Sequence, residues 1–301
     1  MIYQVRHKTT YAYESKVTFA RCVLRLTPRS SATQTVLETS LRVSPEPTLT
    51  SERLGPFGEL ATTVVIETPH KALVIEANAR VDVHSPPSRL DFADPWEGVR
   101  AQALRTADLE REGPASFIYP SARAPLIPAI TEYARSSFSP SRGVIDAATE
   151  LMGRMRRDFT YDAEATDVST APLEAFEARR GVCQDFAHIM ICGLRGLGLP
   201  ARYVSGFLRT YPPPGRPRME GADATHAWVW LWCGEDTGWI GFDPTNDVLA
   251  QDDHIVLASG RDYADVAPID GIILAPGKQT LKVEVDVVPE SDLASPRLAF
   301  G

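Results

Sequence analysis

The chain has the sequence G-V-C-Q-D-F-A-H at residues 181–188, where an apolar helical pattern begins directly after a glycine. Apolar residues recur at helical spacing from Cys183 to Leu194, and Gly198 and Pro200 end the pattern. The first turn of a helix has unpaired backbone N–H groups and a partial positive charge, which together lower the pKa of a thiol placed there. Cys183 is therefore a candidate nucleophile.

A predicted strand pair downstream carries a histidine and an aspartate. The sequence has T-H-A-W-V-W at residues 225–230 and G-F-D-P-T at residues 241–245, with turn residues at 234–238 between them. The apolar runs on either side of the turn predict two antiparallel strands joined in a hairpin. His226 begins the first strand, and Asp243 ends the second.

The hairpin predicts how these two side chains meet. If Trp232 faces Thr237 beside the turn, antiparallel counting places His226 opposite Asp243. A register shifted by two residues places them diagonally, still within reach. Both side chains share a face in either register, because side chains alternate between the faces of a strand. Asp243 then orients one ring nitrogen of His226 and leaves the other for Cys183.

Acyl transfer to a thiol also needs hydrogen-bond donors for the oxyanion that forms. The backbone N–H of Cys183, at the helix start, is one candidate. Tyr161 lies in a polar segment before this helix, and its hydroxyl is a second candidate. The side-chain amide of Gln184 is an alternative. We expect Tyr161 and Gln184 on the substrate-binding side of the site.

A proline-rich loop at residues 210–224 enters directly before His226. Its prolines predict a stiff cleft wall, because proline fixes one backbone torsion. Arg216 and Arg218 in this loop are candidates to meet a substrate carboxylate.

The other cysteines and histidines are given structural interpretations. A cysteine on an apolar stripe is most often a small core residue, and we expect this of Cys192 and Cys233. His188 lies on the same predicted helix as Cys183 but off its stripe, which favours a structural role. The histidines without a predicted partner are expected on the surface or in the core, namely His7, His70, His84 and His254.

A metal site is another use of cysteine and histidine, and the spacing argues against one. Cys183, His188 and Cys192 do not share a helix face. His226 and Cys233 are separated by an odd number of residues and therefore face opposite sides of their strand. The sequence has no C-x-x-C pair. We therefore predict no metal and no cofactor.

Hydrophobic periodicity predicts two regions. Residues 1–90 are β-rich, with period-two alternation at 75–83 and turn residues between short strands, which predicts a small antiparallel sandwich. The chain is predicted to leave it at Ser85-Pro86-Pro87-Ser88. Residues 91–290, which begin with helical patterns, form the predicted catalytic region, and residues 291–301 form a frayed tail.

The composition limits the kinds of partner that are expected for this protein. The 301 residues carry a formal net charge of −8, which argues against nucleic acid because its partners need a basic face. No run approaches the roughly 18 apolar residues that span a bilayer. The N-terminus lacks the apolar region of a signal peptide. We expect a cytoplasmic protein with reduced thiols and with no membrane or nucleic-acid partner.

Four blocks of the sequence resemble the transglutaminase-like superfamily. They are RRGVCQDFA at 179–187, ARYVSGF at 201–207, THAWV at 225–229 and GWIGFDPTN at 238–246. With less specificity, the β-rich N-terminus and GRDYADVAP at 260–268 are similar to flanking parts of bacterial members. The resemblance implies an α+β fold. Its papain-like core packs the helix bearing the nucleophile on an antiparallel sheet, and a β-sandwich-like domain precedes it.

The resemblance also implies a Cys-His-Asp triad, carried onto Cys183, His226 and Asp243, that transfers an acyl group from a peptide or protein amide through a thioester. The acceptor is water in an amidase or protease and an amine in a protein-glutamine gamma-glutamyltransferase. Animal transglutaminases use calcium, but the sequence has no D-x-D-x-D-G loop, so no calcium is carried over. The additional β-domains of those enzymes are also lacking, which favours hydrolysis. A non-catalytic binding module with a residual triad is the alternative from another class, and the competent residues at all three positions disfavour it.

Overall fold

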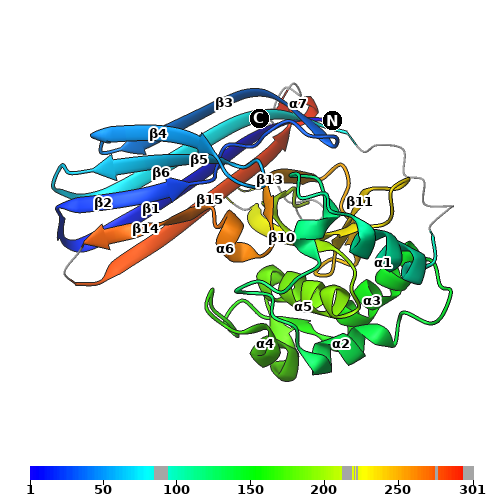
Figure 1. The fold of residues 1–301 in the computed structure, drawn as a ribbon. Helices are drawn as coiled ribbons and strands as arrows, with labels where there is room; N and C mark the ends of the chain where they lie inside the picture. Colours follow the sequence, from blue (N-terminus) through cyan, green and yellow to red (C-terminus); the bar gives the residue numbers. More distant parts are fainter. Residues whose placement is uncertain (85–93, 212–218, 220, 222, 275–276, 294–301) are drawn as a thin grey trace, which may run out of the picture.

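The computed structural model describes most of the chain (Figure 1). The described residues are 1–84, 94–211, 219, 221, 223–274 and 277–293. Three predicted features lie outside them, wholly or in part. These are the exit at 85–88, the stretch of the proline-rich loop that holds Arg216 and Arg218, and the tail from residue 294 onward.

Two four-stranded antiparallel sheets form a β-sandwich, at the upper left of Figure 1. One sheet has the order β15-β1-β6-β3, from Gln279–Pro289, Ile2–Val17, His70–Val83 and Gln34–Ser44. The other has the order β14-β2-β5-β4, from Ile269–Leu274, Phe19–Leu24, Leu60–Ile66 and Leu49–Leu54. Apolar side chains that alternate along these strands form a common core, as period-two patterning predicts.

Two strands of the sandwich come from the far end of the chain, which differs from the predicted regions. β15 pairs with β1 over Gln279–Pro289, and β14 pairs with β2 over Ile269–Leu274. Alternation predicts a strand at 281–287, but local pattern does not identify its partner. Each pairing covers backbone groups along an edge of β1 or β2 that would otherwise be open. Residues 269–289 therefore join the sandwich, although the sequence prediction placed them in the catalytic region.

A five-stranded antiparallel sheet forms the centre of the second region. Its order is β12-β11-β10-β9-β13, from Val248–Leu249, Trp239–Asp243, Ala224–Trp232, Ala201–Leu208 and His254–Gly260. β10 and β11 form the predicted hairpin, and β9 lies between β10 and β13. The first residues of β10 and of β13 are thereby brought near the same end of β9.

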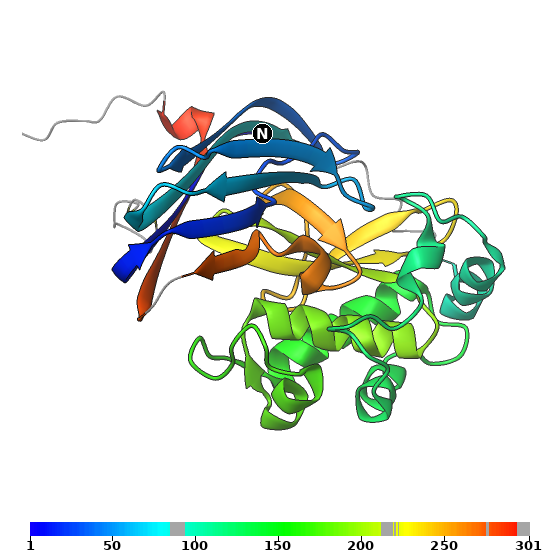
Figure 2. The ribbon, with the colours of Figure 1, turned by 60° about the vertical axis from the view of Figure 1, so that its left-hand side comes forward.

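Helices α2, α4 and α5 lie on the side of this sheet that is away from the sandwich (Figures 1 and 2). The longer helices are α1 (Trp96–Arg105), α2 (Pro128–Arg135), α3 (Val144–Asp158), α4 (Pro172–Ala178) and α5 (Cys183–Gly196). The short elements are η2 (Pro114–Phe117), α6 (Tyr263–Val266), α7 (Glu290–Leu293) and the parallel pair β7 (Thr160–Tyr161) and β8 (Arg180–Gly181). Within the described residues, every helix is too short or too polar to cross a membrane.

Helix α5 is the central element of the second region. It packs against β9, β10 and α2, and every residue from Asp185 to Arg195 is buried. A helix that is covered on all sides is typical of the interior of a domain. The predicted helix start at Cys183 is confirmed. The packing holds that start at a fixed place beside the sheet.

The sandwich and the five-stranded sheet share an apolar cluster. It joins β1, β6 and β15 to β9 and β13 through Tyr3, Val5, Val81, Val83, Phe207, Ile255, Leu257, Val285 and Val287. The amide of Gln34 adds two hydrogen bonds to the backbone of Val256, each 2.8 Å long. Strand β13 is therefore held by β9 and by the sandwich.

Candidate functional site

Cys183 is the first residue of α5, and a buried carboxylate fixes the turn that precedes it. Asp185 accepts a hydrogen bond from the backbone N–H of Val182 at 2.8 Å and from the hydroxyl of Thr166 at 2.6 Å. A Cβ atom at Gly181 would lie 2.6 Å from this carboxylate, so only glycine fits there without a shift of Asp185. The sequence G-V-C-Q-D thus places the thiol at the positive end of a buried helix.

Cys183 differs from the other three cysteines, which are all free thiols as it is. Cys22, Cys192 and Cys233 are buried, whereas Cys183 is only partly buried. Burial raises the pKa of all three buried thiols, to about 11 for Cys22. These three are therefore poor nucleophiles, which agrees with the core role predicted for Cys192 and Cys233.

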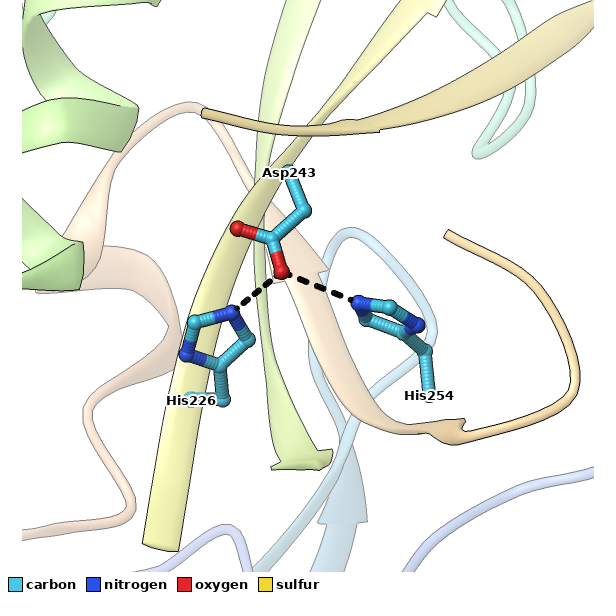
Figure 3. Close-up of side chains that lie close together, drawn as sticks. All are labelled: His226, Asp243 and His254. Carbon is cyan, nitrogen blue, oxygen red and sulfur yellow. Dashed lines mark hydrogen bonds and ion pairs between the residues drawn. The ribbon is translucent and has the colours of Figure 1, made fainter. Parts of the chain in front are cut away.

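His226 and Asp243 meet across the β10–β11 hairpin, as parity predicts. Trp232 pairs with Trp239, so the register is the diagonal one of the two predicted alternatives. The side chains still share a face, and Nε2 of His226 lies 2.8 Å from Oδ2 of Asp243 (Figure 3). Both residues are buried.

Asp243 is held by donors on both of its oxygens. Oδ1 accepts hydrogen bonds from the backbone N–H groups of Thr245 and Asn246, at 3.0 and 3.3 Å. Oδ2 accepts one from the side-chain amide of Asn246 at 2.7 Å, besides its contact with His226. Burial raises the pKa of this carboxyl, but its donors outweigh burial and hold the pKa well below its usual range. Asp243 is an ionised acceptor at neutral pH.

The proton affinity of His226 follows from its two partners. Burial lowers the pKa of the ring, but hydrogen bonds with Asp243 and Cys183 and the charges of these groups raise it to about 10. Because Nε2 is taken by Asp243, Nδ1 is the nitrogen that remains for Cys183. The surroundings thus favour an imidazolium beside the thiol, which is the state that stabilises a thiolate.

His254 is a functional candidate that the sequence interpretation missed. It was expected to have no partner, yet its Nε2 lies 3.1 Å from Oδ2 of Asp243 (Figure 3). The contact depends on the pairing of β13 with β9, which aligns His254 with Leu208. This pairing joins segments that are distant in the sequence. The only local signal is a histidine followed directly by an apolar run, which also describes His226.

Tyr161 and Gln184 lie near the thiol in different ways. Tyr161 pairs with Gly181 across the parallel strands β7 and β8 and is exposed. The part of its ring that is buried and the nearby charge of Cys183 raise the pKa of its phenol. The amide of Gln184 instead donates to the carbonyl oxygen of Val168, at 3.4 Å. The structure therefore brings Tyr161 close to Cys183 and turns Gln184 toward a neighbouring loop, and the binding role of each stays a prediction.

Tyr203, on β9, is a second residue near the thiol that the sequence interpretation did not single out. It is buried, and burial together with the charge of Cys183 raises the pKa of its phenol well above the ordinary value. The ring of His188 lies 4.9 Å from that of Tyr203, between centroids. Burial lowers the pKa of His188 to about 4, and its Nε2 accepts the backbone N–H of Tyr263. A neutral, bonded ring agrees with the structural role predicted for His188.

Comparison with known proteins places this geometry in a family. The model of the transglutaminase-like superfamily matches residues 131–244, and that of the bacterial transglutaminase-like N-terminal region matches residues 3–82. An uncharacterized protein of Mycobacterium tuberculosis is 40% identical over 295 residues, which cover 95% of this chain and 92% of that one. The chain belongs to the transglutaminase-like superfamily. The resemblance predicted from the four sequence blocks is confirmed.

Two further comparisons concern proteins that are less similar in sequence. The crystal structure of a proposed cysteine protease from Cytophaga hutchinsonii has a TM-score of 0.74 and 20% identity, and the match covers 96% of this chain and 91% of that one. This likeness confirms the predicted α+β fold. A protein-glutamine gamma-glutamyltransferase of Pseudomonas aeruginosa is 27% identical over 174 residues, which are 56% of this chain and 26% of that protein.

Proposed function

We propose that this transglutaminase-like protein is a cysteine-dependent amide hydrolase that cleaves a peptide or isopeptide bond through a thioester. Cys183 is the nucleophile, His226 is the general base that takes the thiol proton and then the general acid that gives it to the leaving amine, and Asp243 is the orienting carboxylate. The observation that carries the proposal is His226 itself. It is buried between the Asp243 carboxylate and the thiol, and its pKa is raised to about 10 by both.

The proposed reaction has two halves. The Cys183 thiolate attacks the carbonyl carbon of the amide, and the oxyanion forms beside the Cys183 backbone N–H. The protonated Nδ1 of His226 gives its proton to the amine that leaves, and a thioester remains on Cys183. Nδ1 then takes a proton from water, whose oxygen attacks the thioester. The thiolate leaves as the acid product is released, and the proton on Nδ1 restores the imidazolium.

The acyl acceptor distinguishes this proposal from its nearest alternative. A gamma-glutamyltransferase would pass the acyl group to an amine, and the Pseudomonas aeruginosa relative is described as such an enzyme. The structural neighbour from Cytophaga hutchinsonii is described as a proposed protease, which supports water as the acyl acceptor. Adding a primary amine to the reaction separates the two. Hydrolysis predicts free acid as the main product, and a transferase predicts the amide of the added amine.

A non-catalytic binding module is the alternative from another class. It requires that Cys183, His226 and Asp243 be remnants with no reactive thiol. Two observations disfavour it. Asp243 is hydrogen-bonded to His226, and Cys183 is partly exposed whereas the other three cysteines are buried. We also propose a cytoplasmic location and a peptide or protein amide as the partner, with no nucleic acid and no resident metal or cofactor.

The first test is a screen of a peptide and γ-glutamyl amide library with the wild-type protein, followed by assay of Cys183→Ala on each amide that is cleaved. Cys183→Ala should abolish turnover and formation of the thioester, because it removes the sulfur atom to which the acyl group is bound. Cys233→Ala is the matched control, since it removes a buried thiol that has no role in the proposal. Normal cleavage by Cys183→Ala would contradict the mechanism.

A further inference from the structure

His254 shares the carboxylate oxygen that orients His226. Both Nε2 atoms contact Oδ2 of Asp243, at 3.1 Å from His254 and 2.8 Å from His226. The two rings approach the carboxylate from opposite sides (Figure 3). With the amide of Asn246, this single oxygen has three donors, while Oδ1 is held by two backbone N–H groups. The direction in which Asp243 points is therefore set from several sides.

The other ring nitrogen of His254 shows which nitrogen carries the proton. Nδ1 accepts the backbone N–H of Gln251 at 3.4 Å. A nitrogen that accepts a hydrogen bond has no proton of its own, so the proton of the neutral ring lies on Nε2. His254 is thus a donor to Asp243.

The same proton assignment argues against a metal at this place. His226, Asp243 and His254 offer ligand atoms within 4.8 Å of one another, and two imidazoles with a carboxylate are a donor set that divalent metals accept. A metal would need the lone pair of Nε2 of His254, which would move the ring proton to Nδ1. That proton would then face the N–H of Gln251, donor against donor. A hydrogen-bonded pair fits these contacts better.

The ring of His254 is also held in place. It is buried, and it meets Trp228 edge to face with 5.1 Å between ring centroids. Its strand is paired with β9 and is bonded through Val256 to Gln34 of the sandwich. A donor that cannot turn away limits the positions that the Asp243 carboxylate can take.

We propose that His254 is a positioning residue that holds Asp243 in the orientation that directs His226 toward Cys183. The inference rests on the proposed function of Cys183 and adds a fourth residue to it. His254 acts through Asp243 and contacts neither the thiol nor the scissile amide. Its N–H also makes the carboxylate a weaker base, so that the proton stays on His226 when the imidazolium forms.

Two substitutions separate this role from simple packing. His254→Phe keeps a flat ring against Trp228 and loses the N–H. His254→Gln loses the ring and keeps an N–H donor near the position of Nε2. The titratable groups of this centre include Asp243, His226 and Cys183, with the phenols of Tyr161 and Tyr203 near the thiol. His84 lines a cavity of about 70 Å³ beside His254. His84→Gln is therefore the matched control for the loss of a nearby histidine.

The experiment measures the rate at which iodoacetamide modifies Cys183 from pH 5 to pH 9, together with kcat/KM on an amide that the wild type cleaves. Rates are corrected for the folded fraction, measured by circular dichroism. His254→Phe should raise the pH of half-maximal modification by about 1 unit and lower kcat/KM about tenfold, the range found when an orienting partner is lost. His254→Gln should stay within about threefold of the wild type, and His84→Gln should match it.

If His254→Gln is more impaired than His254→Phe, the positioning role is overturned, and the effect of His254 is one of packing against Trp228. A wild-type pH profile of Cys183 modification that differs between buffer with added zinc and buffer with a chelator would also overturn it. Nitrogen-15 NMR of the His254 ring tests the inference apart from catalysis. A protonated Nε2 is expected in the wild type and in Cys183→Ala, even if Cys183 proves unreactive, and a protonated Nδ1 would contradict the inference.

Discussion

Strands β10 and β13 each carry a histidine near their first residue, but the two histidines have different roles in the site. His254 is the first residue of β13 and His226 the third residue of β10, both are buried, and each places Nε2 against Oδ2 of Asp243. The second nitrogen makes the difference. That of His226 is left for the thiol of Cys183, and that of His254 accepts a backbone N–H from Gln251.

The partner of the second ring nitrogen decides the role of such a histidine. A nitrogen beside a thiol can give and take a proton during the reaction. A nitrogen that accepts a backbone N–H fixes the tautomer and leaves the ring as a donor only. The same side chain on the same carboxylate is thus suited to proton transfer at one strand and to positioning at the other.

The largest expected effect comes from exchanging the two rings for phenylalanine. His226→Phe should lower kcat/KM about 10³-fold, because general acid–base catalysis by a placed side chain contributes roughly 10²–10⁴-fold. His254→Phe should cost about tenfold. Steady-state kinetics on one amide compares the two. Equal losses of kcat/KM in the two variants would contradict the different roles given to His226 and His254.

A smaller loss of activity, combined with a loss of stability, is expected for Asp243→Ala. The substitution removes the common acceptor, so activity should fall about 10²-fold through misplacement of His226. Asp243 is fully buried, and its loss leaves the donors of Thr245 and Asn246 and two rings without their partner. We expect the free energy of unfolding in urea to fall by about 3 kcal/mol, since each unsatisfied buried group costs roughly 1–3 kcal/mol. Cys183→Ala is the control, and equal stability of the two variants would contradict the role given to Asp243.

The pH dependence of stability should reveal the charge on the His226 ring. The pKa of His226 is about 10 in the folded protein and 6.5 for an unperturbed ring. A raised pKa stabilises the fold fully below about pH 6.5, and that contribution is lost as pH rises toward 10. The free energy of unfolding should therefore fall more steeply between these values in the wild type than in His226→Phe. Parallel curves in urea titrations at several pH values would argue against an imidazolium at His226.

The parts of the site that depend on local pattern could be predicted from the sequence. Gly181 and the apolar stripe after it place the start of α5 at Cys183, and strand parity puts His226 and Asp243 on one face. The register itself needed the structure, because both candidate registers satisfy the same pattern. His254 was missed because its contact depends on β13 pairing with β9. The partners of β14 and β15 were missed for the same reason, since alternation identifies a strand but not its neighbour.

The most direct test of the central claim is the labelling of the four cysteines by iodoacetamide at pH 6, read by mass spectrometry in the wild type and in His226→Phe. We expect rapid modification of Cys183 alone in the wild type, because burial raises the pKa of the other three thiols. In His226→Phe the modification of Cys183 should slow at least about tenfold, because the thiolate loses its imidazolium. Equal, slow labelling of all four cysteines, or unchanged labelling of Cys183 without His226, would contradict the account.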